Sequence, residues 1–312
     1  MKARGFSILL SAIRFLCVTL GLLAIFTPAQ AAELLDGKSR IAIVSAFAPE
    51  WVSLQDELTE RQEYEINGNT YLTGKLAGRD VVMYLSGVSM VNAAMTTQSA
   101  LDRFVVTAVI FSGIAGGVDP ALHIGDVVIA GQWGQYLEAI FARETEDGFT
   151  IPPFFKQEFP GFGMIVPKSV TLHRKGSGEE EARFWFPVDE DLLEIAGTVA
   201  SKLELEDCVE ANKCLSKRPR IVVGGNGVSG PVFVDNAAFR EYVMKTFQAR
   251  VLDMESAAVA HVAYSNGVPF LAVRSLSDLA GGGEGTNEMS TFMALAATNS
   301  AAVVKALLAE IP

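Results

Sequence analysis

The chain of 312 residues carries 36 acidic and 25 basic side chains, which gives a formal net charge of −11 at pH 7, and half of its residues are hydrophobic. This acidic balance disfavours nucleic acid and anionic membranes as partners, because both repel a negatively charged protein. A chain of this length can bury one large core, and no stretch between residues 40 and 312 has the composition of a linker. We therefore expect a single domain at residues 32–312.

The first 31 residues have the composition of a secretory signal peptide. They hold three basic and no acidic side chains, an apolar run at 15–26 and a small-residue pattern at 29–31. A membrane anchor is the alternative, but the run is shorter than the roughly 20 residues that a span needs. We expect residues 1–31 to be removed, which leaves 36 acidic and 22 basic residues, a net charge of −14. The mature protein is then periplasmic or secreted, without a membrane partner.

The rest of the chain alternates short apolar runs with helical patterns, as α/β folds do. Strands are predicted at residues 40–46, 81–85, 105–112 and 220–223, and residues 123–130 are a turn that leads into another strand; a further unit lies around Asp253. Helices are predicted at residues 51–58, 90–104, 189–203 and 236–248. A last helix at 290–311 is expected to pack Phe292, Leu295, Val303 and Leu307 against the sheet. The alternation implies a largely parallel or mixed central sheet flanked by helices.

One long segment does not follow this alternation. Residues 144–183 are rich in Pro, Gly and Phe and carry a charged tip at 174–181. Loops of this length are usually functional or mobile. We therefore interpret the segment as a loop insertion that acts as a lid.

Two cysteines remain once Cys17 leaves with the signal peptide. Cys208 and Cys214 are close enough in sequence to close a small loop in an oxidising compartment, which favours a disulfide. Two free thiols, or half of a metal site, are the alternatives. No histidine lies near them in the sequence, so the pattern predicts no metal site.

Two carboxylates, 23 residues apart, are placed where α/β folds keep their ligands. Glu255 is expected at a helix start and Asp278 just past the end of a strand. Each has a simpler alternative, because carboxylates also stabilise helix starts and Ser-Asp pairs are common in turns. Asp253 is assigned a structural role, and Arg274 is a possible ion-pair partner without an assigned role.

Four motifs then give the chain a resemblance to the nucleoside phosphorylase and nucleosidase superfamily. They are Gly113-Ile114-Ala115-Gly116-Gly117 with Ile124-Gly125-Asp126-Val127-Val128, then Val228-Ser229-Gly230-Pro231-Val232-Phe233-Val234-Asp235, then Asp253-Met254-Glu255, then Ser277-Asp278. The resemblance covers nearly all of residues 40–312. It is closest to methylthioadenosine/S-adenosylhomocysteine nucleosidases and their secreted relatives, which include plant vegetative storage proteins.

The resemblance implies a purine nucleosidase that cleaves the N-glycosidic bond of adenine nucleosides. It implies that Asp278 protonates the departing base and that Glu50 activates water. It also implies that Glu255 holds the ribose hydroxyls, with Met254 beneath the sugar. Cleavage leaves positive charge on the ribose and negative charge on the base, so an acid near the base and carboxylates near the sugar suit the reaction. A solvated glutamate at a helix start is the alternative for Glu50.

Further contacts with the substrate are implied by the same motifs. Phe233 matches the aromatic that stacks on the base, and the backbone at Val234 would contact the purine edge; Phe233 in the core is the alternative. Phe47 and Phe292 match positions that line the sugar and 5′ pocket. Gly113 and Ile114 begin the glycine-rich loop and are expected to contact the substrate.

Water or phosphate could serve as the nucleophile in this superfamily. Phosphate needs cationic or dense N–H ligation, and residues 45–58 contain no Arg or Lys, which favours water. Ile114 stands where many members have Ser or Thr, which removes a hydroxyl that could hold phosphate or anchor the attacking water. A phosphorylase and a non-catalytic nucleoside-binding or storage protein therefore remain alternatives. No metal or organic cofactor is implied, and the resemblance implies a homo-oligomer.

Overall fold

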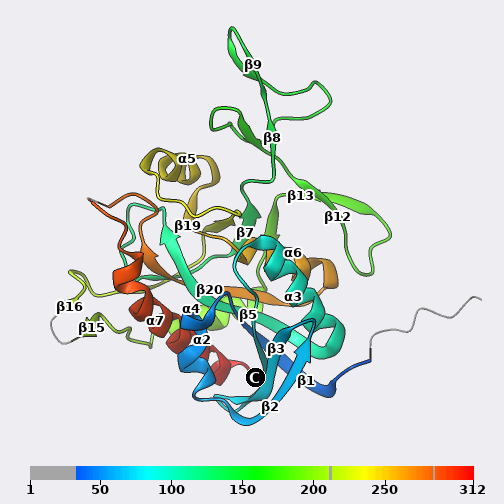
Figure 1. Cartoon of the computed structure of the whole chain (residues 1–312), viewed down its shortest axis with the longest axis vertical. Coiled ribbons are helices and arrows are strands. Elements are labelled where there is room, and N and C mark those ends of the chain that lie inside the picture. The colour runs from blue at the N-terminus through cyan, green and yellow to red at the C-terminus, as the bar shows by residue number, and fades with distance from the viewer. Residues whose placement is uncertain (1–32, 211–212, 284) are drawn as a thin grey trace, which may run out of the picture. The chain divides into compact units, whose positions relative to one another are not determined.

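Twelve strands form one mixed sheet through the unit Leu35–Pro312 (Figure 1). The computed structural model describes residues 33–210, 213–283 and 285–312, so the expected signal peptide lies outside the described residues. The main path of hydrogen-bonded strands is β14 (Trp185–Pro187), β7 (Gln132–Gln135), β18 (Asn226–Ser229), β19 (Ala249–Asp253), β5 (Phe104–Gly117), β1 (Asp36–Ser45), β4 (Arg79–Leu85), β3 (Asn69–Leu76) and β2 (Thr59–Ile66). A branch from β5 contains β20 (Phe270–Asp278), β6 (Val127–Ile129) and β17 (Ile221–Val223).

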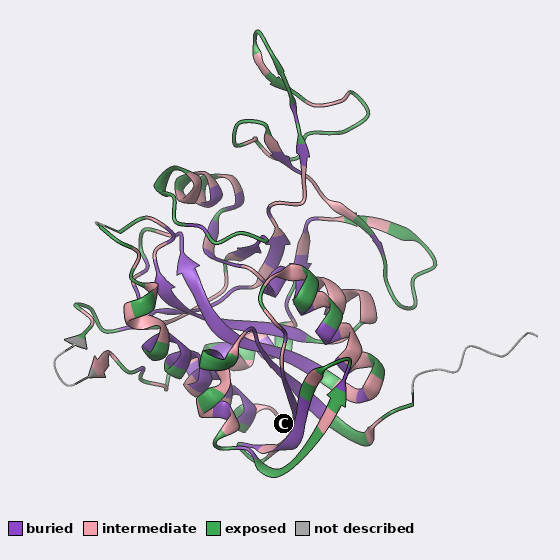
Figure 2. Cartoon of the chain, viewed as in Figure 1, coloured by how far each residue is buried: buried purple, intermediate pink, exposed green. Residues whose placement is uncertain are grey.

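The sheet mixes parallel and antiparallel pairs, and the central strand β5 takes part in both. β1 pairs in parallel with β4 and β5, and β20 pairs in parallel with β5. β2, β3 and β4 are successively antiparallel, as are β20 with β6 and β19 with β5. Figure 2 shows that the central strands are buried, which explains their continuous apolar runs. The expected α/β fold is confirmed, with the sheet in its mixed form.

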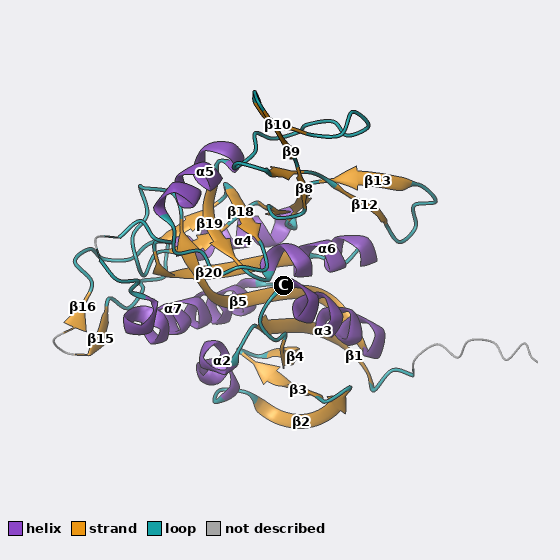
Figure 3. Ribbon diagram, turned by 45° about the horizontal axis from the view of Figure 1, so that its top comes forward, coloured by secondary structure: helices purple, strands orange, loops and turns teal. Residues whose placement is uncertain are grey.

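Six helices of the described chain pack against this sheet (Figure 3). They are α2 (Ala48–Gln55), α3 (Met90–Arg103), α4 (Glu190–Ala200), α5 (Ala237–Phe247), α6 (Ser256–Asn266) and α7 (Met289–Glu310). α7 packs on β5 and β20 and also contacts α2 and α4, whereas α3 packs on α6. α2 begins three residues earlier than Trp51, because Pro49 is tolerated in the first turn of a helix.

The C-terminal helix was predicted correctly in position but not in every contact. Leu295, Val303 and Leu307 are buried as expected. Phe292 is only partly buried and lines a separate hollow beside His123 and Cys214, so the expectation that it packs on the sheet is wrong. In the part of the chain that the structure describes, α7 alone has the length and apolar composition of a membrane span. Its most apolar stretch is 56% buried, which is typical of a core helix.

The hairpin of β2 and β3 is absent from the sequence prediction. β2 lies at the edge of the sheet and is mostly exposed, so its residues lack the apolar alternation of a half-buried strand. The turn itself did carry a signal. Asn67 and Gly68 both have positive φ, 52° and 77°, which is the geometry that makes Asn-Gly a strong hairpin signal.

Residues 139–183, which include the expected loop at 144–183, form an arm of three short antiparallel strand pairs (Figure 1). The pairs are β8 (Ala139–Phe141) with β11 (Ile165–Pro167), β9 (Arg143–Thr145) with β10 (Gly148–Thr150), and β12 (Val170–His173) with β13 (Glu180–Arg183). Phe141 and Phe154 in this arm are largely exposed. No residue of the arm lines the cavity described below, and its role as a lid stays a prediction.

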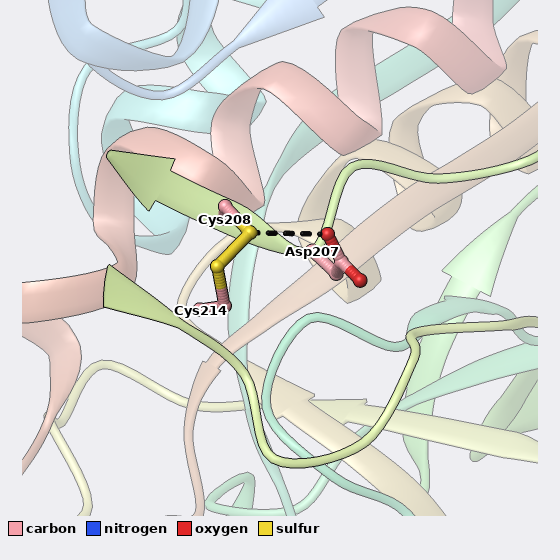
Figure 4. The surroundings of a disulfide bond; sticks show 3 residues. All are labelled: Asp207, Cys208 and Cys214. Atoms are coloured by element: carbon pink, nitrogen blue, oxygen red, sulfur yellow. Dashed lines mark hydrogen bonds between the residues drawn. A yellow bond between two sulfur atoms is a disulfide. The ribbon is translucent and has the colours of Figure 1, made fainter. Parts of the chain in front are cut away.

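The predicted disulfide is present. Cys208 and Cys214 join the short strands β15 (Cys208–Glu210) and β16 (Lys213–Cys214), as Figure 4 shows. The Cys208 sulfur also lies 3.2 Å from Asp207 Oδ1, but a disulfide sulfur carries no proton to donate. The bridge therefore closes a hairpin outside the central sheet.

Candidate functional site

A cavity of about 250 Å³ opens where several strands of the sheet end. Its walls come from the segments that follow β1, β4, β18 and β19, from the last residues of β5 and β20, and from the first residue of α7. The lining residues are Ala46, Phe47, Glu50, Val88, Ile114, Ala115, Gly116, Val232, Phe233, Val234, Leu252, Asp253, Met254, Glu255, Ser277, Asp278 and Met289. Ligands of α/β proteins bind at the carboxyl ends of strands, so the position fits a binding site.

Glu50 lies in the first turn of α2, but its carboxylate points back to the strand ends. Its Oε2 accepts hydrogen bonds from the backbone N–H of Ala46 at 2.6 Å and of Phe47 at 3.3 Å, and Oε1 accepts from Ile114 N at 2.8 Å. Only 2% of the residue is exposed, so it is not the solvated glutamate of the alternative interpretation. Burial raises the pKa of Glu50, although nearby Arg274 and these N–H donors oppose the rise.

Gly113 allows this carboxylate to approach β5. A Cβ atom at Gly113 would lie 2.5 Å from Glu50 Oε1 and 2.1 Å from Arg274 Nη1, closer than real Cβ atoms are found. The register of the sheet places Gly113 beside Arg274 on β20. Gly113 itself does not line the cavity, so the structure places it behind the site.

Arg274 is fully buried among three carboxylates. Its Nε lies 2.7 Å from Asp253 Oδ2, its Nη1 lies 3.8 Å from Glu50 Oε1, and its Nη2 lies 3.6 Å from Glu255 Oε2. The guanidinium stacks 3.9 Å from the ring centroid of Phe111. Nη1 and Nη2 are buried and make no hydrogen bond. The sequence assigned this arginine no role, because nothing near it along the chain indicates that three acidic partners converge on it.

Asp253 is the acidic residue that caps α6. Its Oδ1 accepts from the backbone N–H of Glu255 at 3.2 Å and of Ser256 at 3.1 Å. It also accepts hydrogen bonds from the hydroxyls of Ser229 and Ser256. These contacts agree with the structural role expected for Asp253, although the residue also borders the cavity.

Glu255 stands at the N-cap position of α6 without capping that helix. Its Oε1 instead accepts a hydrogen bond of 2.7 Å from the backbone N–H of Ser89. Ser89 has a φ of 78°, an uncommon conformation for a residue with a side chain, at the start of α3. Burial raises the pKa of Glu255 to about 7, with Arg274 opposing and Asp253 adding to the rise. This carboxyl is therefore buried, half-ionised near neutrality and available to a ligand.

Asp278 ends β20 next to Gly116 of β5. The pairing slips by one residue between Leu276 and Asp278, and this irregularity explains why the consecutive residues Ser277 and Asp278 both line the cavity. Asp278 Oδ1 accepts from Ala280 N at 2.8 Å, and Oδ2 accepts from Ser277 Oγ at 3.0 Å. Burial raises the pKa of Asp278, and these hydrogen bonds oppose the rise. Asp278 is thus both a turn acceptor and a desolvated acid.

The remaining lining is apolar. Phe233 is 57% exposed at the cavity, so it is not a core residue, and Val234 beside it is buried. The Ile114 side chain packs with Phe47 and Met289. Of the residues expected in the sugar and 5′ pocket, Phe47 lines the cavity and Phe292 does not.

Val88 and Met289 line the cavity but were missed from the sequence. Met289 begins α7 after the glycine-rich loop that follows Asp278. Its closeness to Asp278 along the chain was the sequence feature that could have predicted its place in the cavity. Val88 lies just before Ser89, whose contact with Glu255 no local pattern indicates. No group of three or more side chains able to hold a metal ion was found in the described ranges.

Known proteins are similar to this chain over most of its length. Residues 40–309 match the family described as the Phosphorylase superfamily. The 5′-methylthioadenosine/S-adenosylhomocysteine nucleosidase of Tolumonas auensis is 30% identical over 274 residues, which are 87% of this chain and 100% of the relative. The protein of the same name from a Geobacillus species is 31% identical over 273 residues, 87% of this chain and 99% of the relative.

Solved structures share the fold. The Neisseria meningitidis nucleosidase of that name, in complex with methylthio-immucillin-A, has a TM-score of 0.65 at 25% identity and covers 88% of this chain and 100% of its own. The Colwellia psychrerythraea enzyme in complex with adenine gives 0.64 at 25% identity, with coverage of 88% and 96%. Futalosine hydrolase of Helicobacter pylori gives 0.64 at 23% identity, with coverage of 88% and 98%, and shares the fold. This chain therefore belongs to the phosphorylase superfamily.

Proposed function

We propose that the protein is an exported nucleosidase that hydrolyses the N-glycosidic bond of adenine nucleosides of the methylthioadenosine and S-adenosylhomocysteine type. The observation that carries the proposal is one apolar cavity lined by Glu50, Glu255 and Asp278, three buried carboxyl groups whose pKa values are all raised. The relatives that bear this activity in their names align over nearly their whole length, which supports the same assignment.

Asp278 suits the role of the general acid. Because burial raises the pKa of this carboxyl, a larger fraction is protonated near neutrality than for an ordinary aspartate. A protonated Asp278 can donate to N7 of the purine as the bond to the sugar breaks, so the base leaves as a neutral molecule. Phe233 lies exposed at the same wall and offers its ring to the base.

Glu50 and Glu255 suit the sugar side of the reaction. The sugar gains positive charge in the transition state, and carboxylates held in a desolvated site stabilise such charge more strongly than they would in water. Behind the cavity wall, Nη1 and Nη2 of Arg274 lie 3.8 Å and 3.6 Å from these two carboxylates, where the guanidinium offsets part of their negative charge. Glu50 would accept the proton of the attacking water, and Glu255 would bind the ribose hydroxyls above Met254.

Water is favoured over phosphate as the nucleophile. The residues that line the cavity include no Lys, Arg or His, and three of them besides Asp278 are acidic. Arg274 behind the wall is already surrounded by three carboxylates. A phosphate dianion would therefore meet net negative charge without a free cation to hold it.

Release of adenine from methylthioadenosine in phosphate-free buffer tests this proposal. We expect release without phosphate, and a loss of roughly two to four orders of magnitude in kcat for Asp278→Asn, as for other positioned general acids. Activity that appears only with phosphate would establish a phosphorylase instead. Nucleoside binding without turnover would favour the non-catalytic alternative. Ile114 supports this alternative, because its side chain offers no hydroxyl beside the carboxylate of Glu50.

The export that this proposal includes is supported by the composition of residues 1–31 and by the Cys208–Cys214 bridge, since disulfides persist mainly in oxidising compartments. Mass spectrometry of the protein from the periplasmic and extracellular fractions of an expressing bacterium tests it. We expect a mature N-terminus near residue 32. An uncleaved chain in the cytoplasm would contradict export.

We also propose that the protein is a homo-oligomer. Val91 and Met95 on α3 are 79% and 55% exposed, and Val88 and Phe233 are exposed where they line the cavity. A second copy that covered these side chains would remove apolar surface from water beside the site. Light scattering after size exclusion should give a mass of at least two chains, and a monomer at micromolar concentration would contradict this.

A further inference from the structure

Two loops meet in direct backbone contact beside Asp278. One follows β18 and carries Phe233 and Asp235, and the other connects β20 to α7. Gly281 has a φ of 86°, and a Cβ atom there would lie 2.3 Å from Asn236 N. The same Asn236 N–H donates to Ala280 O at 3.2 Å. The loop that carries Phe233 and the loop that follows Asp278 are therefore packed against each other.

The side chain of Asn287 links these loops a second time. Its Nδ2 donates to Asp235 Oδ1 at 3.1 Å and to Asp278 Oδ1 at 3.4 Å. Its Oδ1 accepts from Met289 N at 2.9 Å, at the start of α7. An amide carries two N–H donors and one carbonyl acceptor, so all three contacts can exist together.

The two oxygens of Asp278 are unequal because of this arrangement. Oδ1 accepts from Ala280 N and from Asn287 Nδ2, which engages both of its lone pairs. Among the described residues, Oδ2 accepts from the hydroxyl of Ser277 alone. A proton on Oδ1 would displace one of two N–H donors, whereas Oδ2 keeps a free lone pair. The hydrogen bonds therefore select the oxygen that can carry the acidic proton.

We propose that Asn287 is a positioning residue that directs the proton of Asp278 to Oδ2 and ties this acid to the loop that carries Phe233. The inference deepens the proposed function and rests on it for its catalytic meaning. A purine that packs on Phe233 would thereby fix the distance and direction to the acid, because Asp235 and Asn287 connect the two walls. Positioning of this kind lowers the barrier without direct contact with the substrate.

The charged groups around Asp278 determine whether a substitution nearby raises or lowers its pKa. The acidic groups are Asp235, in the loop that carries Phe233, and Glu288, in the loop before α7. Glu50 and Glu255 line the same cavity as Asp278. The nearby cations in the described ranges are Arg240, whose side chain lies against Gly282, and Arg274 of β20, whose side chain lies against Gly113. Burial is the first cause of the raised pKa of Asp278, the charge of Asp235 adds to the rise, and the Asn287 hydrogen bond opposes it. Loss of Asn287 should thus raise this pKa, and loss of the Asp235 charge should lower it.

Two variants, Asn287→Leu and Asp235→Asn, test this by the pH dependence of adenine release. We expect Asn287→Leu to lower kcat by roughly 10- to 100-fold, as misplacement of a catalytic group does, with a smaller change in KM. The high-pH limb of the pH–rate profile should move to higher pH, because Asp278 remains protonated up to a higher pH. Asp235→Asn should move the same limb to lower pH. A purely structural role would not shift the limb in opposite directions.

Asn236→Ala provides a matched control in the same loop. Asn236 caps α5 through a hydrogen bond of 2.9 Å from Phe239 N to its Oδ1, so the variant should lower the melting temperature. It leaves Asp235 and Asn287 in place and should not move the pH profile. A shift in this control equal to that of Asn287→Leu would overturn the inference.

A second readout does not depend on turnover. The pH titration of the Asp278 carboxyl carbon can be followed by NMR in protein labelled at aspartate Cγ, with Asp278→Asn to assign the signal. We expect a higher midpoint in Asn287→Leu and a lower one in Asp235→Asn. Equal midpoints in both variants and the parent overturn the inference even if adenine is released. Separated midpoints without adenine release support the hydrogen-bond assignment while the proposed hydrolysis fails.

Discussion

Glu255 is the carboxyl whose pKa, about 7, lies within the ordinary range of physiological pH. The fold favours its protonated form, because this pKa is raised from an ordinary value of 4.5. The corresponding stabilisation is complete below the unfolded pKa and is lost as pH rises through 7. Glu255→Gln removes this ionisation.

We expect the unfolding free energy of the parent to fall by about 2 to 3 kcal/mol relative to Glu255→Gln between pH 5 and pH 8. Urea unfolding at both pH values measures the difference. A gap between the two proteins that is constant with pH would show that Glu255 ionises like an exposed glutamate.

Arg274 holds together a buried group of like charges. In the part of the chain that the structure describes, its guanidinium is the cation in contact with Glu50, Asp253 and Glu255. Arg274→Met keeps the stacking on Phe111 but leaves buried carboxylates without a counter-charge. We expect a loss of about 3 to 5 kcal/mol in unfolding free energy, as for other broken buried pairs. Arg274→Lys, which retains a charge, should lose less, and equal losses would contradict the electrostatic cause.

The sequence predicted the site residues whose positions depend on the order of the strands, but not the contacts between distant segments. Glu50 and Glu255 come shortly after β1 and β19, and Asp278 ends β20, so their positions near the carboxyl ends of the strands could be predicted from the chain order. The partners of Arg274 and Glu255 come from distant segments, and no local pattern encodes such convergence. Phe292 and Met289 lie one turn apart on α7, and the rotation of that helix decides that Met289 faces the cavity.

At the scale of elements, the hairpin of β15 and β16 is held by a bridge that closes a short loop. Chain-entropy arguments give such a loop about 2 kcal/mol of stabilisation. We expect a reducing agent to lower the melting temperature while adenine release at 25 °C continues, because neither cysteine lines the cavity. The variant Cys208→Ser with Cys214→Ser should melt at the lower temperature with or without reductant. Loss of activity on reduction would place the hairpin in the working site.

Buried elements were more predictable than exposed ones. β1, β5 and β20 are continuous apolar runs because both of their faces are covered, and such runs mark strands. β2 and the hairpin of β9 and β10 expose most of their side chains, and the other strands of the arm are only three or four residues long, so little periodic pattern appears in their sequence. Exposure and short strands therefore explain both the missed hairpin and the arm that was expected to be a loop.

At the scale of the molecule, the site exists only in the complete sheet. Glu50 follows β1, Ile114 lies in β5 and Asp278 ends β20, and these strands are neighbours although they are far apart in the chain. We expect adenine release and circular dichroism to be lost at the same urea concentration, as in two-state unfolding. Activity lost at lower urea would show that the loops around Asp278 open before the sheet does.

Met254 and Met289 make the cavity wall sensitive to oxidation. Peroxide converts a thioether to a sulfoxide, which would bring a strong dipole into the apolar surface against which a sugar and its 5′ group would lie. We expect mild peroxide to inactivate the protein, methionine sulfoxide reductase to restore it, and bound adenine nucleoside to slow the loss. Peptide mapping identifies the oxidised positions, and inactivation without oxidation at Met254 or Met289 would contradict this account. Under the proposed export from the reducing cytoplasm, oxidation of these two methionines would limit how long the protein stays active.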